Sequence, residues 1–287
     1  MWLAYAFLAT VASSARSLLS KKVVTSVSEW TALWTFVTFA LPIACLYLLL
    51  TGFMINNPIF WPIIAVRILI DTIATYLYFK ALKLEEVSYI APLYTFQPIL
   101  TTATSYFINH ETPTTLALTG MGTIIGGTLC LFVTKLKLNH FHPNPNLLKA
   151  TGFSFASMFF WSFASAIHKQ GVLNSSPATY FFVSYVCFTL LFGLIAYLTD
   201  KTGMLKALSP RYRAINIGNG LSLGFDHTFT LTAIATGFVG YVDAIKSSST
   251  MVTSFLAVTL LKEKLTPLKT ISILIVSFGV LLILLGR

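Results

Sequence analysis

Ten long apolar runs, separated by short polar connections, constrain this chain more than any other feature of its sequence. A helix needs about 20 apolar residues to cross the hydrocarbon of a bilayer, and each run reaches roughly that length. The runs lack the two-residue alternation of a membrane β-barrel. The sequence therefore predicts an all-α membrane protein with ten transmembrane helices, over residues 2–20, 29–51, 59–82, 87–108, 113–134, 147–168, 178–199, 211–236, 240–261 and 266–286.

The composition agrees with a lipid environment. Hydrophobic residues make up 56% of the 287 residues and charged residues only 10%. A soluble protein of this size cannot bury so much apolar surface. The net charge of +10 comes mostly from Lys and Arg in the short connections. Such residues set the topology and contact lipid head groups, so we expect a lipid bilayer and no nucleic acid as a partner.

The sequence carries no pattern that indicates enzymatic chemistry. Cys45, Cys130 and Cys187 lie inside apolar runs and form neither a CxxC pair nor a Cys/His ligand spacing. HExxH and GxSxG motifs are also missing from the sequence. We therefore expect no metal site, no cofactor and no enzymatic activity.

An internal repeat relates the two halves of the chain. An offset of 152 residues aligns Ala81 with Ala233 and Tyr89 with Tyr241 without a gap. The same offset aligns further identical residues in the pairs Val87/Val239, Thr101/Thr253, Glu111/Glu263, Thr114/Thr266, Leu116/Leu268 and Gly127/Gly279. Each half then holds five helices, and an odd number places the two copies in opposite orientations. Inverted repeats indicate a secondary transporter with its substrate site between the halves.

The repeated segments resemble a known family. The residues that carry the resemblance are Glu111 followed by Thr112-Pro113, and Lys262-Glu263-Lys264 followed by Thr266-Pro267, each pair of segments ending in a Gly-containing run. They are similar to the paired EamA domains of the drug/metabolite transporter superfamily. The resemblance implies two five-helix repeats, over 1–138 and 147–287, and transport of small metabolites by alternating access. The four-helix drug exporters of that superfamily carry a glutamate in their first helix, whereas this chain has Arg16 there.

The orientation in the membrane has two conflicting indications. Fourteen Lys and Arg residues fall in the connections after the odd-numbered runs, and only Lys169 and Arg287 fall on the other side. Because positive connections stay in the cytoplasm, this count places both termini outside. The family resemblance implies that both termini are inside. We expect the protein in the cell (inner) membrane as a monomer or a homodimer.

Several charged residues lie inside the predicted helices. Each costs about 2.5–3.5 kcal/mol at a helix centre, and such residues usually face a watery cavity or the bundle interior. Arg16 and Asp243 fall near helix ends, where they can reach the interface. The others are Arg67, Asp71, Asp226 and Lys246.

Arg67 and Asp71 stand four residues apart, so they share one helix face. Two interpretations remain open. The pair either locks its helix to a neighbour, or it binds a charged group of the substrate and opens during the transport cycle. Asp226 lies one turn from the position that the repeat equates with Asp71, and His227 follows it. Asp71, Asp226 and His227 are therefore candidates for proton coupling.

Polar and aromatic residues complete the predicted substrate site. Lys246 precedes a polar run that includes Ser249, and the repeat equates Lys246 with Tyr94. Gln97 follows Tyr94 beside two prolines, where freed backbone carbonyls can bind a ligand. Trp161 either packs or stacks on a substrate. The predicted substrate-binding residues are Arg67, Asp71, Tyr94, Gln97, Trp161, Asp226, Lys246 and Ser249.

These observations favour a secondary active transporter of a small polar metabolite. A charged or zwitterionic compound such as an amino acid suits the buried charges of both signs, and proton coupling is one option. The alternative is a transporter of organic cations, in which tryptophans and carboxylates form a cage and Arg67 is structural. A membrane enzyme and a channel are the remaining classes. Saturable flux with slow turnover distinguishes a carrier from a channel.

Overall fold

The computed structural model describes residues 1–24, 27–85, 90, 93–138, 145–249 and 267–286. Within these ranges nearly all of the chain is helical, and no strand forms beyond one isolated bridge between Ile55 and Ser175. The predicted all-α class is confirmed for this part of the chain. Several residues that the internal repeat and the family resemblance used lie outside the described residues, as does the side chain of Arg16: Val87, Tyr89, Thr253, Lys262, Glu263, Lys264 and Thr266.

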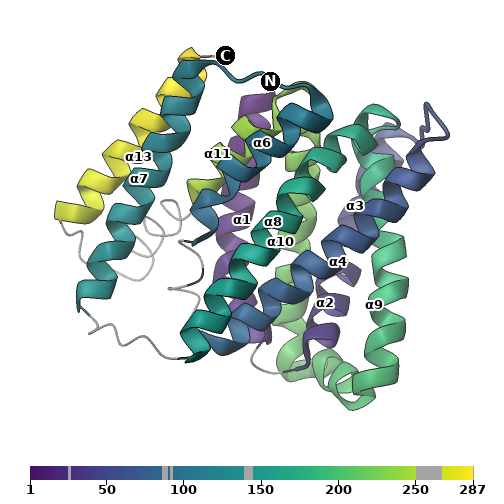
Figure 1. Ribbon diagram of the computed structural model, residues 1–287. Coiled ribbons are helices and arrows are strands. Elements are labelled where there is room, and N and C mark those ends of the chain that lie inside the picture. The colour runs from purple at the N-terminus through teal and green to yellow at the C-terminus, as the bar shows by residue number, and fades with distance from the viewer. Residues whose placement is uncertain (25–26, 86–89, 91–92, 139–144, 250–266, 287) are drawn as a thin grey trace.

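The helices follow the predicted order along the chain (Figure 1). The first half contains α1 (Trp2–Val24), α2 (Glu29–Thr38), α3 (Leu41–Thr51), α4 (Phe60–Leu84), the single 3₁₀ turn η1 (Tyr94–Phe96), α6 (Gln97–Asn109) and α7 (Thr115–Leu138). The second half contains α8 (Pro145–Leu173), α9 (Pro177–Leu208), α10 (Pro210–Thr236), α11 (Val239–Ser247) and α13 (Pro267–Leu285).

Proline and serine set several helix starts. Pro177 and Pro210 occupy the first position of α9 and α10, where a missing N–H costs nothing. The hydroxyl of Ser176 accepts a hydrogen bond from the Thr179 N–H and caps α9. The run predicted over 29–51 breaks into α2 and α3, because Pro42 cannot donate the hydrogen bond that would continue the helix.

Two predicted boundaries were wrong in the second half. The helix α8 continues to Leu173, so Lys169 lies inside it rather than in a connection. The helix α9 continues to Leu208, past a kink at Asp200. In both places polar residues follow the apolar run without a strong breaker, and the helix extends until Pro177 and Pro210 begin the next one.

Four stretches are long and apolar enough to cross a membrane, counted over the described residues: Glu29–Thr51, Phe60–Leu84, Pro145–Leu173 and Pro177–Leu208. Shorter apolar helices cover Trp2–Ser14, Thr115–Cys130 and Thr270–Leu285. Large apolar side chains on the outside of the bundle are exposed, such as Leu49, Leu190 and Leu198. An exterior of this kind suits contact with lipid rather than water.

The helices pack in pairs that mirror the internal repeat. The repeat equates α1 with α8 and α4 with α10. The helix α1 packs on α10, and in the same way α8 packs on α4. Equivalent helices also pack on each other: α7 on α13, α2 on α9, and α6 on α11. Figure 1 shows α7 beside α13 at one edge of the bundle. Exchanging the two halves therefore leaves these contacts unchanged, as a duplicated architecture requires.

Glycines allow the closest helix contacts. A Cβ atom on Gly120 would lie 2.7 Å from the backbone oxygen of Gly279, and the reciprocal distance is the same. Gly220 and Gly224 of α10 pack closely against Phe39 and Ile43. These two glycines form a GxxxG motif, and the motif serves helix packing here.

A second GxxxG motif, Gly122 and Gly126 of α7, is typical of helix contacts in membranes but forms none in the described part of the chain. No atom of the described residues lies within 4 Å of a Cβ added to either glycine. Gly120 and Gly127 of the same helix approach α13 instead. The spacing of four was present at both places, but only the tertiary arrangement decides which face of α7 meets its partner.

We expect Gly120→Ala to destabilise the protein, because the new methyl group meets backbone atoms of α13 that cannot move aside. Overpacking of this kind costs about 1–3 kcal/mol, which lowers the melting temperature by roughly 2–10 °C. Gly122→Ala is the matched control and should melt at the same or a slightly higher temperature, since alanine favours the helix. Equal melting temperatures of the two variants in detergent would contradict this packing.

Candidate functional site

A cavity of about 330 Å³ lies inside the bundle, and both halves of the chain line it. Side chains reach it from α1, α2, α4, η1 and α6 of the first half, and from α8, α9, α10 and α11 of the second. All the residues predicted for substrate binding or proton coupling line this cavity: Arg67, Asp71, Tyr94, Gln97, Trp161, Asp226, His227, Lys246 and Ser249. The structure thus brings them together, and their roles remain predictions.

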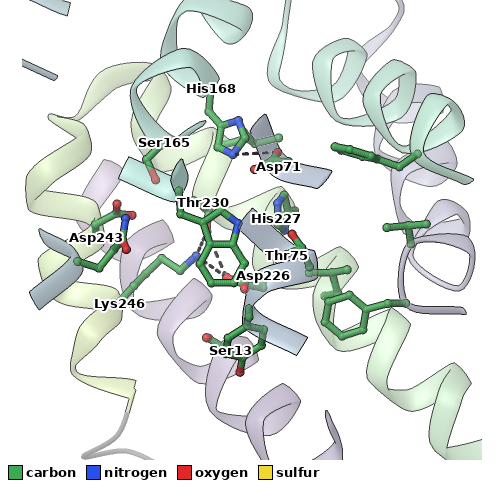
Figure 2. Close-up of a pocket in the computed structure, with 18 of the residues that line it drawn as sticks. Ser13, Asp71, Thr75, Ser165, His168, Asp226, His227, Thr230, Asp243 and Lys246 are labelled. Atoms are coloured by element: carbon green, nitrogen blue, oxygen red, sulfur yellow. Dashed lines mark hydrogen bonds and ion pairs between the residues drawn. The ribbon is translucent and has the colours of Figure 1, made fainter. Parts of the chain in front are cut away.

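An ion pair between α10 and α11 crosses the cavity. The ammonium of Lys246 lies 2.9 Å from Asp226 Oδ1 and donates to the Thr230 hydroxyl at 2.9 Å. Thr230 in turn donates to Asp226 Oδ1 at 3.2 Å. Figure 2 shows Lys246 extended from α11 toward this pair of α10 residues. Asp226 is fully buried, whereas 20% of the Lys246 side chain is exposed, so the lysine is the accessible partner.

A second ion pair lies within α4. Arg67 Nε donates to Asp71 Oδ2 at 3.2 Å, as the spacing of four residues predicted. The guanidinium stacks 4.5 Å from the ring centre of Tyr180 and 5.5 Å from that of Phe188, both on α9. Arg67 has no exposed surface. Contact between this guanidinium and a substrate would therefore require the pair and its aromatic cover to open.

Two histidines lie near the ion pairs. His168 Nε2 lies 3.9 Å from Asp71 Oδ2, and His168 Nδ1 is 3.0 Å from the Tyr180 hydroxyl. The ring of His227 lies 6.3 Å from that of His168 and 5.2 Å from that of Tyr185. His168 therefore joins Asp71 to the α9 aromatic residues, and His227 lies beside Asp226 on α10 (Figure 2).

Three aromatic rings form one wall of the cavity. Trp161 lies 5.2 Å from Tyr78 and 5.6 Å from Tyr94, and the two tyrosine rings are 5.3 Å apart, measured between ring centres. We call this group the aromatic wall. Gln97 lies one residue beyond η1, and its Nε2 donates to Thr101 Oγ1 at 3.3 Å. The wall offers ring faces to a ligand while the amide offers a polar atom.

Sequence reasoning missed three residues of this site. It placed Asp243 near the membrane interface, but the carboxylate lines the cavity and interacts with Thr101 and Ser165. It placed His168 at a helix end, whereas α8 continues beyond it and turns His168 inward, seven residues after Trp161. Thr230 was not considered, although it follows Asp226 by four residues and so shares its face. Helical spacing from residues already singled out would have found His168 and Thr230.

The repeated glutamate of the first half forms an ion pair near the start of α11. Glu111, between α6 and α7, pairs with Lys169 of α8 at 2.5 Å and accepts from the Val239 N–H at 2.8 Å. Lys169 also donates to the Gly237 carbonyl at 2.9 Å. Burial raises the pKa of the Glu111 carboxyl, although Lys169 and the Val239 N–H oppose this effect. These contacts tie three segments together where α10 ends and α11 begins.

Among the described residues, no group of three or more His, Cys, Asp or Glu side chains is placed to hold a metal ion. The cavity instead combines two ion pairs, a third carboxylate and an aromatic wall. Such a site can bind a small ligand that carries charge.

The family assignment follows from two matches on one chain. The model of the EamA-like transporter family matches residues 1–133 and again residues 148–285. This chain belongs to the EamA-like transporter family. A solved structure described only as a crystal structure of a protein shares its fold, with a TM-score of 0.80 and 16% sequence identity, over 99% of this chain and 96% of the other. No curated protein matched the sequence.

The double match confirms the predicted family and the repeat architecture. Together with the long apolar helices, it shows an integral, multi-pass membrane protein. Members of the EamA-like family are transporters rather than enzymes. At the level of the family, the function of this chain is transport of small molecules across a membrane.

We expect Arg67→Met to destabilise this EamA-like protein, because Asp71 would remain buried without its cation. Breaking a buried pair costs about 3–5 kcal/mol, a fall in melting temperature of at least roughly 6 °C. Adding Asp71→Leu to Arg67→Met should restore part of the loss, which a double-mutant cycle measures.

Lys83→Met is the control for this experiment. It breaks the more exposed Lys83–Glu29 pair of 2.8 Å and should change the melting temperature little. If Arg67→Met were no more harmful than Lys83→Met, the buried pair would not stabilise α4.

Proposed function

We propose that this EamA-like protein is a secondary active transporter that carries a small charged or zwitterionic metabolite, such as an amino acid, by alternating access. Ten transmembrane helices would form two inverted five-helix repeats, over 1–138 and 147–287, in the cell (inner) membrane. The observation that carries the proposal is the cavity between the halves, lined by the pairs Arg67–Asp71 and Asp226–Lys246. Inverted repeats with a central site are the usual architecture of such carriers.

The Asp226–Lys246 pair supplies a mechanism for binding. Lys246 is partly exposed to the cavity, so a carboxylate or another anionic group of the substrate can compete with Asp226 for its ammonium. While the substrate replaces Asp226 as the partner of Lys246, Asp226 would still accept a hydrogen bond from the Thr230 hydroxyl. Since a charge in a low-dielectric cavity needs a partner, binding and the state of this pair are coupled.

Proton coupling is part of the proposal. His168 lies 3.9 Å from Asp71, and the ring of His227, which follows Asp226 in the chain, lies 6.3 Å from that of His168. A proton that reached either carboxylate would weaken its pair with Arg67 or Lys246. Exchange between proton and substrate at these carboxylates would link transport to a proton gradient.

The size and lining of the cavity restrict the substrate. A volume of about 330 Å³ is at the lower end of ligand pockets, which favours a metabolite over a drug-sized molecule. The aromatic wall of Tyr78, Tyr94 and Trp161 supports a second candidate, the transport of organic cations by cation–π contact. A thermal-shift screen with amino acids, nucleosides, sugar phosphates and quaternary amines separates the two, because only a bound ligand raises the melting temperature.

We expect Lys246→Ala to abolish the flux of the best zwitterionic ligand of that screen into proteoliposomes. The variant should also melt at a lower temperature, because Asp226 would stay buried without its cation, so its flux is measured on the protein that remains folded in the membrane. Lys201→Ala, which removes an exposed lysine beside Tyr197, is the control and should transport normally. Full transport by Lys246→Ala, or a screen in which quaternary amines alone bind, would refute the zwitterion proposal.

A further inference from the structure

Asp243 is the one carboxylate of the described cavity lining that forms no ion pair. The other two, Asp71 and Asp226, pair with Arg67 and Lys246, and the ammonium of Lys246 lies on Asp226. The described lining therefore holds three carboxylates and only two side chains that are permanently cationic. Leaving a carboxylate in such a place without a cation is costly. Lys246 acts on Asp243 only through space, so among the described residues Asp243 has no cation in direct contact.

Two hydrogen-bond acceptors beside this gap lack donors. Asp243 Oδ2 and Gln97 Oε1 are buried and have no hydrogen-bond partner among the described residues. Thr101 stands between their side chains, since it accepts from Gln97 Nε2 and interacts with the Asp243 carboxylate. Buried acceptors are normally satisfied, and orphaned ones mark strain or a missing ligand. Two of them joined by one threonine indicate a missing donor.

The surroundings of the gap suit a small cation. Ser165 of α8 interacts with Asp243 from the other side and lies one helical turn from Trp161. The aromatic wall therefore begins beside the carboxylate, and ring faces attract a cation. Figure 2 shows Ser165, Asp243 and Lys246 around one part of the cavity, with Lys246 extended away from Asp243 toward Asp226.

We propose that Asp243 and Gln97 form a subsite for the primary ammonium group of the transported compound. This inference rests on the proposed function and extends it to one chemical class, the zwitterionic or cationic primary amines. The ammonium would donate one hydrogen to Asp243 Oδ2 and another to Gln97 Oε1, and its carbon skeleton would lie along the aromatic wall. A carboxylate on the same molecule would then reach Lys246, three residues from Asp243 on α11.

The test uses four related probes on the purified protein in nanodiscs, by isothermal titration calorimetry: phenylalanine, 2-phenylethylamine, its N,N,N-trimethyl form and 3-phenylpropionate. The wild-type protein should bind phenylalanine most tightly and 2-phenylethylamine more weakly. The trimethyl form has no hydrogen to donate, and 3-phenylpropionate has no cation, so both should bind at least about tenfold more weakly than the primary amine. Equal or tighter binding of either compound would overturn the subsite, as would failure of both amines to bind.

Variants of Asp243 and Gln97 then test whether these two residues bind the ammonium group. Asp243→Asn keeps the shape of the side chain and should weaken 2-phenylethylamine binding by about 100-fold, the size expected for loss of a buried charge partner. Gln97→Ala should weaken it less, because a neutral acceptor is lost. Glu85→Gln removes a carboxylate beyond the end of α4, outside the cavity lining, and should bind as the wild type does.

The outcomes separate the subsite from the proposed function. If Asp243→Asn binds both amines as the wild type does, the ammonium lies elsewhere and the subsite is refuted, while transport is untouched. If the wild type binds primary amines through Asp243 but moves none of them into proteoliposomes, the subsite stands and the transport proposal fails for this class. The comparison of probes on the wild type needs no variant. It can therefore refute the subsite even if Asp243→Asn folds poorly.

Discussion

Buried charge inside an apolar bundle is the constraint on which the rest of this structure depends. Arg67 and Asp226 have no exposed surface, and each must find a partner within the protein. Arg67 finds Asp71 on its own helix and aromatic rings on α9, which fixes α4 against α9. Asp226 finds Lys246 on another helix, which fixes α10 against α11. The two pairs thus set the distances between the helices that enclose the cavity.

The repeat explains why these charges meet in one place. Exchange of the two halves keeps the main helix contacts, so the fourth and ninth predicted helices, which contain α6 and α11, approach each other at the centre. The close contact of Gly120 with Gly279 holds α7 and α13 together at the edge. The cavity is lined by both halves, and Glu111 ties the connection between α6 and α7 to Lys169 of α8 and to the Val239 N–H of α11. Separation of these segments would require Glu111 to leave its partners.

Much of the fold and part of the site could be predicted from the sequence. The all-α class and the order of the helices follow from the apolar runs, and the Arg67–Asp71 pair follows from a spacing of four, because both are local properties. The pair between Asp226 and Lys246 needs two helices to meet, which spacing within one helix cannot show. Asp243 was placed at the interface for the same reason, since depth depends on how α11 sits beside α6. The face of α7 that meets α13 also depends on tertiary packing, since Gly120 and Gly127 make the contact rather than the GxxxG pair Gly122 and Gly126.

The most direct test of a central cavity that opens to both sides is a measurement of access to Ser247, which lines it. A Ser247→Cys variant, in a background without Cys45, Cys130 and Cys187, is treated with a membrane-impermeant thiol reagent in right-side-out and in inverted vesicles. Alternating access predicts labelling from both sides, protection by bound substrate, and vesicles that remain tight to ions. Labelling from one side only, or from neither, would contradict the account, and labelling from both sides with an ion leak would indicate a channel.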